Sequence, residues 1–111
     1  MLVKRYNKLV RDKIPEICRK NGAVPKTRIA KSKKEFIDYL CKKVLEEATE
    51  LSQERGSRPE IAREIADLEE VLFWLAKTIG VSPKGIAKIR KEKNRTRGAF
   101  KKKIILLFTK E

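Results

Sequence analysis

Residues 43–75 read KVLEEATELSQERGSRPEIAREIADLEEVLFWL, and two pairs of acids in this stretch set the architecture of the chain. Glu47 and Glu50 form the first pair, and Glu64 and Asp67 form the second. Each pair is spaced i, i+3, so its two acids share one face of a helix. Two antiparallel helices joined by a turn near Gly56 would bring all four carboxylates together. Converging oxygen ligands of this kind are typical of a Mg²⁺ or Mn²⁺ site.

The acids also lie on or beside apolar helix faces. At 100° per residue, Glu47 falls within the arc of apolar residues that begins at Phe36, and Glu50 falls on the edge of that arc. An unpaired buried carboxylate costs several kcal/mol. Most acids of Lys- and Glu-rich helices face water or pair with a base at i+4. Two pairs at the apolar edges of adjacent helices favour a metal site over that ordinary arrangement.

Serine capping boxes mark the starts of the two long helices. Ser32-Lys33-Lys34-Glu35 predicts a helix from about Lys33 to Glu54, and Ser57-Arg58-Pro59-Glu60 predicts one that runs to about Ile79 and ends at Gly80. We predict shorter helices at Pro15–Lys20 and from Ser82-Pro83 to about Arg95. The apolar run Ile104–Phe108 predicts a strand, paired with Thr27–Ala30 or with residues 1–10.

The predicted fold class is therefore all-α, a helical-bundle core of two long antiparallel helices plus shorter helices, with one or two short peripheral strands. A single domain spans residues 1–111. On the second long helix, Ile61, Ile65, Leu68, Leu72, Leu75 and Ile79 form the main apolar stripe. Residues 71–76 are apolar nearly all round, which a monomer of 111 residues can hardly bury. We infer a homo-oligomer.

Composition limits the chemistry. The chain has no histidine, which excludes Ser-His-Asp and Cys-His nucleophiles and His-ligated zinc. Cys18 and Cys41 are far apart and are expected to be buried thiols rather than a disulfide or a zinc site. No apolar run approaches the roughly 20 residues of a membrane span. Because Met1-Leu2-Val3 leads directly into Lys4-Arg5 without a signal-peptide core, we expect a cytoplasmic protein.

The net charge of +14 is unevenly distributed. Residues 35–70 hold eleven of the fifteen acids, the first 34 residues hold twelve Lys and Arg, and residues 84–103 hold ten. An acidic centre between basic flanks suits a polyanionic ligand bridged by metal, and it also suits nucleic-acid binding.

Three blocks of the sequence resemble a known family. Residues 43–51, KVLEEATEL, with residues 64–68, EIADL, resemble the ExxE…ExxD signature of the MazG-like all-α NTP pyrophosphohydrolases. Residues 6–15, YNKLVRDKIP, and 92–100, EKNRTRGAF, are similar to the blocks that bracket this core in one branch. That branch is described as phosphoribosyl-ATP-pyrophosphohydrolase-like, or as house-cleaning noncanonical NTP pyrophosphatases.

The resemblance implies a dimer or tetramer that uses Mg²⁺ to cleave an NTP to NMP and pyrophosphate. It implies that Glu47, Glu50, Glu64 and Asp67 bind the metal, and that Glu46 is an outer acid or orients water, with Glu46 and Glu47 as the catalytic pair. Cleavage of a phosphoanhydride needs charge neutralisation and positioning more than covalent catalysis. The candidates for phosphate contacts are Lys8, Arg11, Lys13, Lys93 and Arg97.

The alternative is a small basic helical module that binds nucleic acid without catalysis. Its only support is the net charge, because the sequence has no aromatic-studded basic strand and no RNP-like block. It also leaves the acids at the apolar edges unexplained. We therefore expect a nucleotide rather than a nucleic acid as the ligand.

Overall fold

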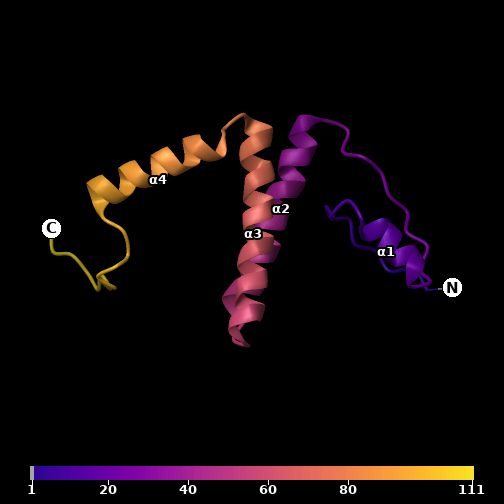
Figure 1. Cartoon of the computed structure of the whole chain (residues 1–111), viewed down its shortest axis with the longest axis horizontal. Helices are drawn as coiled ribbons and strands as arrows, with labels where there is room; N and C mark the ends of the chain where they lie inside the picture. The colour runs from indigo at the N-terminus through magenta and orange to yellow at the C-terminus, as the bar shows by residue number, and fades with distance from the viewer. Residues whose placement is uncertain (1) are drawn as a thin grey trace. The chain divides into compact units, whose positions relative to one another are not determined.

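The computed structural model describes residues 2–111, and this range contains four helices and no strand (Figure 1). The helices are α1 (Ile14–Lys20), α2 (Lys33–Gln53), α3 (Arg58–Ile79) and α4 (Pro83–Arg97). The predicted all-α class is confirmed. The chain divides into two compact units, Met1–Gly80 and Val81–Glu111. The prediction of one functional domain over both units stays a prediction.

The helix starts follow the serine caps. Ser32 accepts a hydrogen bond from the Glu35 amide at 3.1 Å, and Ser57 accepts one from the Glu60 amide at 3.4 Å. The carboxylate of Glu35 does not bond the amide of Ser32, as in an ideal capping box, but that of Lys31, at 2.9 Å. Gly80 ends α3 with φ of 87°, a left-handed conformation that favours glycine.

The first unit is built on α2 and α3, which pack side by side and run in opposite directions (Figure 1). Leu40 of α2 and Val71 of α3 are its buried apolar residues, and Glu47 of α2 is buried with them. The predicted main stripe of α3 is only partly correct, because Ile65, Leu72 and Ile79 are all more than 40% exposed. The partly buried face of α3 carries Ile61, Glu64, Leu68, Val71 and Leu75 instead.

The apolar part of α3 has one face against α2 and others open to solvent. Val71 is buried, but Leu72, Phe73 and Trp74 are 45%, 42% and 40% exposed. The Trp74 ring meets Phe73 edge to face with centroids 5.6 Å apart, and its Nε1 donates to Glu70. Large apolar side chains gathered in this way leave a surface that a partner could cover.

The second unit consists of α4 and the segment after it. Ser82 caps α4 by accepting from the Gly85 amide at 3.0 Å, and no residue of α4 is buried. The strand predicted at Ile104–Phe108 is absent, and these five residues are each more than 70% exposed. A strand requires a partner to satisfy its backbone groups. Neither Thr27–Ala30 nor residues 2–10 form one, and Met1 lies outside the described residues.

Both cysteines are free thiols, as predicted. Neither is fully buried, so the expectation of buried thiols is wrong. Cys18 is half-buried on α1, and Cys41 is exposed on α2. On the helical projection Cys41 lies at the edge of the apolar arc of α2, which agrees with its exposure. Among the helices formed by residues 2–111, none is both long enough and apolar enough to cross a membrane.

Candidate metal centre

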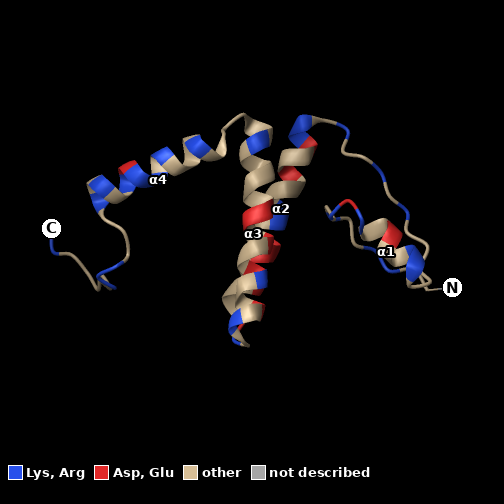
Figure 2. Ribbon diagram, viewed as in Figure 1, with Lys and Arg blue, Asp and Glu red and all other residues tan. Residues whose placement is uncertain are grey.

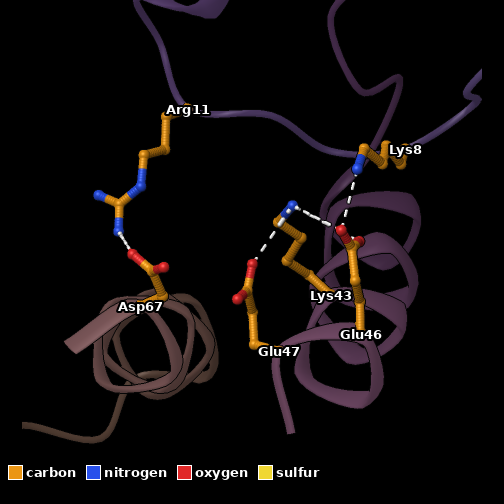
Figure 3. A network of polar contacts seen from close by, with 6 residues as sticks. All are labelled: Lys8, Arg11, Lys43, Glu46, Glu47 and Asp67. Carbon is orange, nitrogen blue, oxygen red and sulfur yellow. Dashed lines mark hydrogen bonds and ion pairs between the residues drawn. The ribbon is translucent and has the colours of Figure 1, made fainter. Parts of the chain in front are cut away.

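Three of the four predicted metal-binding acids lie together between α2 and α3. Glu47, Glu64 and Asp67 each offer one carboxylate oxygen, and these oxygens lie within 4.8 Å of one another. Glu64 and Asp67 come from successive turns of α3, and Glu47 comes from the face of α2 that packs against it. Figure 3 shows Glu47 and Asp67 near one another on the two helices. We call these three residues the acid cluster.

Two oxygens of the acid cluster are buried without a hydrogen-bond partner. They are Oε2 of Glu47 and Oε2 of Glu64. Glu47 as a whole is only 7% exposed. Buried polar atoms are almost always paired, and an unpaired carboxylate oxygen is among the costliest exceptions. Hard oxygen donors that converge at this spacing fit Mg²⁺ or Mn²⁺.

The surroundings of Glu47 oppose its negative charge. Burial raises the pKa of the Glu47 carboxyl, and the charges of Glu50 and Asp67 raise it further. Lys43 acts in the other direction, since its Nζ lies 3.5 Å from Oε1 of Glu47. One ammonium does not compensate for burial and two neighbouring acids. A divalent cation would.

The other two predicted acids stand outside the cluster. Glu50 is exposed, although its charge acts on Glu47. Glu46 is half-buried and accepts a hydrogen bond from Lys8 Nζ at 2.9 Å, with Lys43 Nζ 3.5 Å away. The Lys8 hydrogen bond lowers the pKa of Glu46. Glu46 is therefore an ionised acid one residue from the cluster, and its role in catalysis stays a prediction.

Two predicted phosphate-binding residues reach the acids from the N-terminal segment. Lys8 pairs with Glu46 on α2, and Arg11 Nη2 donates to Oδ1 of Asp67 on α3 at 2.8 Å (Figure 3). Lys13 directly precedes α1 and is exposed. Lys93 and Arg97 are exposed on α4, in the second unit. Phosphate binding by all five residues stays a prediction.

Lys43 was not among the predicted site residues. Its side chain is 15% exposed and lies 3.5 Å from carboxylate oxygens of both Glu46 and Glu47. The signal was present in the sequence, because Lys43 is spaced i, i+3 and i, i+4 from these acids. Lys43 also lines a small pocket between the N-terminal segment and α2, together with Asn7, Lys8, Leu9, Tyr39, Lys42 and Glu46.

The charges separate along the chain in the way the sequence suggests. Figure 2 shows most acids of the first unit on α2 and α3, whereas the charged residues of α4 are all Lys and Arg except Glu92. No family model matches the chain, and neither a curated protein nor a solved structure matches it. The assignment of a function therefore rests on the acid cluster and the cations around it.

Proposed function

We propose that the chain is a Mg²⁺-dependent nucleoside triphosphate pyrophosphohydrolase, which converts NTP and water to NMP and pyrophosphate. The observation that supports this most is Glu47, a buried carboxylate with an unpartnered oxygen beside the oxygens of Glu64 and Asp67. The resemblance to the MazG-like family suggests a noncanonical NTP or a related phosphoribosyl nucleotide of the cytoplasm as the substrate.

The proposed roles follow from where the side chains lie. Glu47, Glu64 and Asp67 hold the metal, and the nearby Glu50 adds negative charge. Bound Mg²⁺ would neutralise phosphate charge and polarise a phosphoryl oxygen. Arg11 binds phosphate oxygens through directional charge-assisted hydrogen bonds. Lys8 stays bonded to Glu46, and its ammonium has further N–H donors that can contact a phosphate oxygen.

Glu46 is best suited to orient the attacking water. Its pKa is lowered by Lys8, so it is ionised at neutral pH and can accept a hydrogen bond from water. A carboxylate with a lowered pKa is a weak base, which favours orientation over full proton abstraction. Phosphoryl transfer depends mainly on positioning and charge neutralisation, so a weak base is sufficient.

The products provide the direct test. In a panel of common and modified NTPs with Mg²⁺, at least one nucleotide should yield NMP and pyrophosphate in equal amounts, and EDTA should abolish the reaction. Anion-exchange chromatography with a pyrophosphate-specific assay measures both products. Formation of NDP and orthophosphate alone would exclude a pyrophosphohydrolase.

One observation favours nucleic-acid binding as a second candidate function. Helix α4 is exposed along its length, and its only acid is Glu92, which pairs with Arg95 at 2.6 Å. In that case alanine substitutions of Lys88 and Lys91 should reduce the salt dependence of binding to single- or double-stranded nucleic acid. Asp67→Asn should then leave nucleic-acid binding unchanged. If the protein is a pyrophosphohydrolase, Asp67→Asn should instead abolish its activity, and the alanine substitutions of Lys88 and Lys91 should have little effect on it.

We further propose that the protein is a homo-oligomer, a dimer or a tetramer. The exposed side chains of Leu72, Phe73 and Trp74 support this, because they form an apolar surface on a helix that already packs on α2.

Replacing Leu72 with Glu should dissociate the oligomer. Leu72 is 45% exposed and lies off the α2–α3 contact, so the charge should disrupt the intersubunit surface more than the helix pair. Light scattering at micromolar concentration measures the mass. The exposed Glu69, replaced by Gln, is the control on the same helix. A wild-type protein that is strictly monomeric would contradict the proposal.

A further inference from the structure

We propose that residues 8–11, here called the N-terminal strap, supply an internal cation, the Arg11 guanidinium, which the metal displaces from Asp67 and which then binds the nucleotide. In the metal-free protein the guanidinium of Arg11 forms an ion pair with the carboxylate of Asp67. The metal takes over Asp67, and the released guanidinium then binds a phosphate of the nucleotide. This proposal rests on the proposed function, since it concerns the same acid cluster.

The strap is attached to both long helices. Lys8 Nζ lies 2.9 Å from Oε1 of Glu46 on α2, and Arg11 Nη2 lies 2.8 Å from Oδ1 of Asp67 on α3. These pairs join residues that are 38 and 56 positions apart. Leu9 and Val10, between the two anchors, are half-buried. Figure 3 shows the strap passing above the acids from Lys8 to Arg11. It is therefore seated over the acid cluster.

The two ion pairs that attach the strap differ in how easily they separate. The Arg11–Asp67 pair is the more open, with side chains 58% and 41% exposed, against 40% and 29% for Lys8–Glu46. Exposed ion pairs contribute little, because both charges are well solvated when apart. A divalent cation held by three carboxylates can therefore displace Arg11. Lys8 bonds Glu46, which is outside the cluster, and keeps the strap in place.

The released Arg11 remains beside the metal centre. Its planar guanidinium can donate two parallel hydrogen bonds to a phosphate, a geometry that a lysine ammonium cannot reproduce. Metal binding would therefore improve phosphate binding in two ways, through its own charge and by freeing Arg11. By linkage, phosphate would strengthen metal binding to the same extent.

Replacing Arg11 with Ala should move two affinities in opposite directions. Without nucleotide, Mn²⁺ should bind up to about fivefold more tightly, because Asp67 no longer has a competing partner. With saturating Mg²⁺, inorganic pyrophosphate should bind about tenfold more weakly, because a charge-assisted hydrogen bond is lost. Electron paramagnetic resonance of free Mn²⁺ measures the first change, and calorimetry measures the second. Arg11→Lys should fall between wild type and Arg11→Ala in both.

Arg63→Ala is the control for a change in local charge. Arg63 is exposed on α3 one turn before Asp67, and it forms no ion pair with any residue from 2 to 111. The increase in Mn²⁺ affinity for Arg11→Ala must exceed that for Arg63→Ala. Weaker Mn²⁺ binding in Arg11→Ala would overturn the proposal and make Arg11 a residue that positions Asp67 as a ligand. An unchanged affinity for pyrophosphate would also overturn it.

The wild-type titration separates this proposal from the proposed function. A wild-type protein that binds no Mn²⁺ overturns both the metal centre and the strap. Mn²⁺ and pyrophosphate affinities that shift as expected, in a protein that hydrolyses no NTP of the panel, support the strap and overturn only the assigned reaction.

Discussion

Replacing Asp67 with Asn should lower NTP turnover at least about 100-fold, which corresponds to about 2.7 kcal/mol of transition-state stabilisation. The Asn side chain keeps one oxygen near Glu47 and Glu64 but removes a full negative charge from the acid cluster. Mg²⁺ prefers charged oxygen ligands in a nearly ideal geometry, so this loss weakens metal binding directly. The fold should survive, because Asp67 is only half-buried and its partner Arg11 is exposed.

Asp38→Asn is the matched control, since Asp38 is exposed on α2 outside the acid cluster. It should retain wild-type turnover and wild-type Mn²⁺ affinity. Circular dichroism should show the same helical content in both variants. A loss of helical signal in Asp67→Asn would mean that Asp67 is structural, and turnover near the wild-type rate would exclude it as a metal ligand.

The helices were predictable because their signals are local. The serines at 32, 57 and 82 accept hydrogen bonds from amides three residues later, and Gly80 supplies the left-handed turn that ends α3. The start of α1 differs from its prediction by one residue, and the ends of α2 and α4 differ by one and two residues. Helix ends fray and are tightened by single bonds, so such differences are expected.

The rest of the fold depends on distant contacts that periodicity does not contain. Ile104–Phe108 has the composition of a strand, yet no partner strand exists within residues 2–111. Likewise, the seven-residue spacing of Ile65, Leu72 and Ile79 shows that they share a face of α3. It does not show that this face turns away from α2.

In the candidate site, too, some features follow from local sequence spacing and others depend on distant contacts. The spacing within Glu47–Glu50 and within Glu64–Asp67 places each pair on one helix face, but the depth of each acid depends on how α2 and α3 pack. Glu47 is buried and Glu50 is exposed as a result. The contacts of Lys8 and Arg11 with these helices lie beyond any local pattern. Only the resemblance to a family suggested that residues 6–15 belong to the site.

Replacing Glu47 with Gln should stabilise the metal-free protein at neutral pH and remove most of its stabilisation by Mg²⁺. Burial raises the pKa of Glu47 above its ordinary value of 4.5, so the folded state opposes the charge that the unfolded state carries freely. At a Mg²⁺ concentration 100 times the dissociation constant, the wild type should gain about 2.7 kcal/mol. For a chain of this length that is roughly 10 °C in Tm. Glu47→Gln should gain much less.

The pH dependence of the Tm in EDTA shows whether the charge of Glu47 stabilises or destabilises the metal-free protein. Glu47 contributes stability below its unfolded pKa of 4.5, and this contribution is lost as pH rises through its raised folded pKa. The Tm of Glu47→Gln should therefore exceed that of the wild type at pH 7.5, and the difference should disappear as the pH falls toward 4.5. Other acids, such as Glu35 with a pKa lowered to about 2, make both proteins less stable in acid and cancel in the difference.

A lower Tm for Glu47→Gln than for the wild type in EDTA at pH 7.5 would identify a structural ion pair in place of a metal centre. The Lys43 and Glu47 side chains are 15% and 10% exposed and lie 3.5 Å apart. If this pair stabilised the fold, neutralising Glu47 would leave the largely buried Lys43 ammonium with Glu46 as its remaining acid partner and would lower the Tm in EDTA at neutral pH. Lys43→Met separates the two cases. It should destabilise the metal-free wild type, where Lys43 offsets the charge of Glu47, and have a smaller effect when Mg²⁺ is bound. An equal loss of Tm with and without Mg²⁺ would mean that the ion pair, and not the metal, balances Glu47.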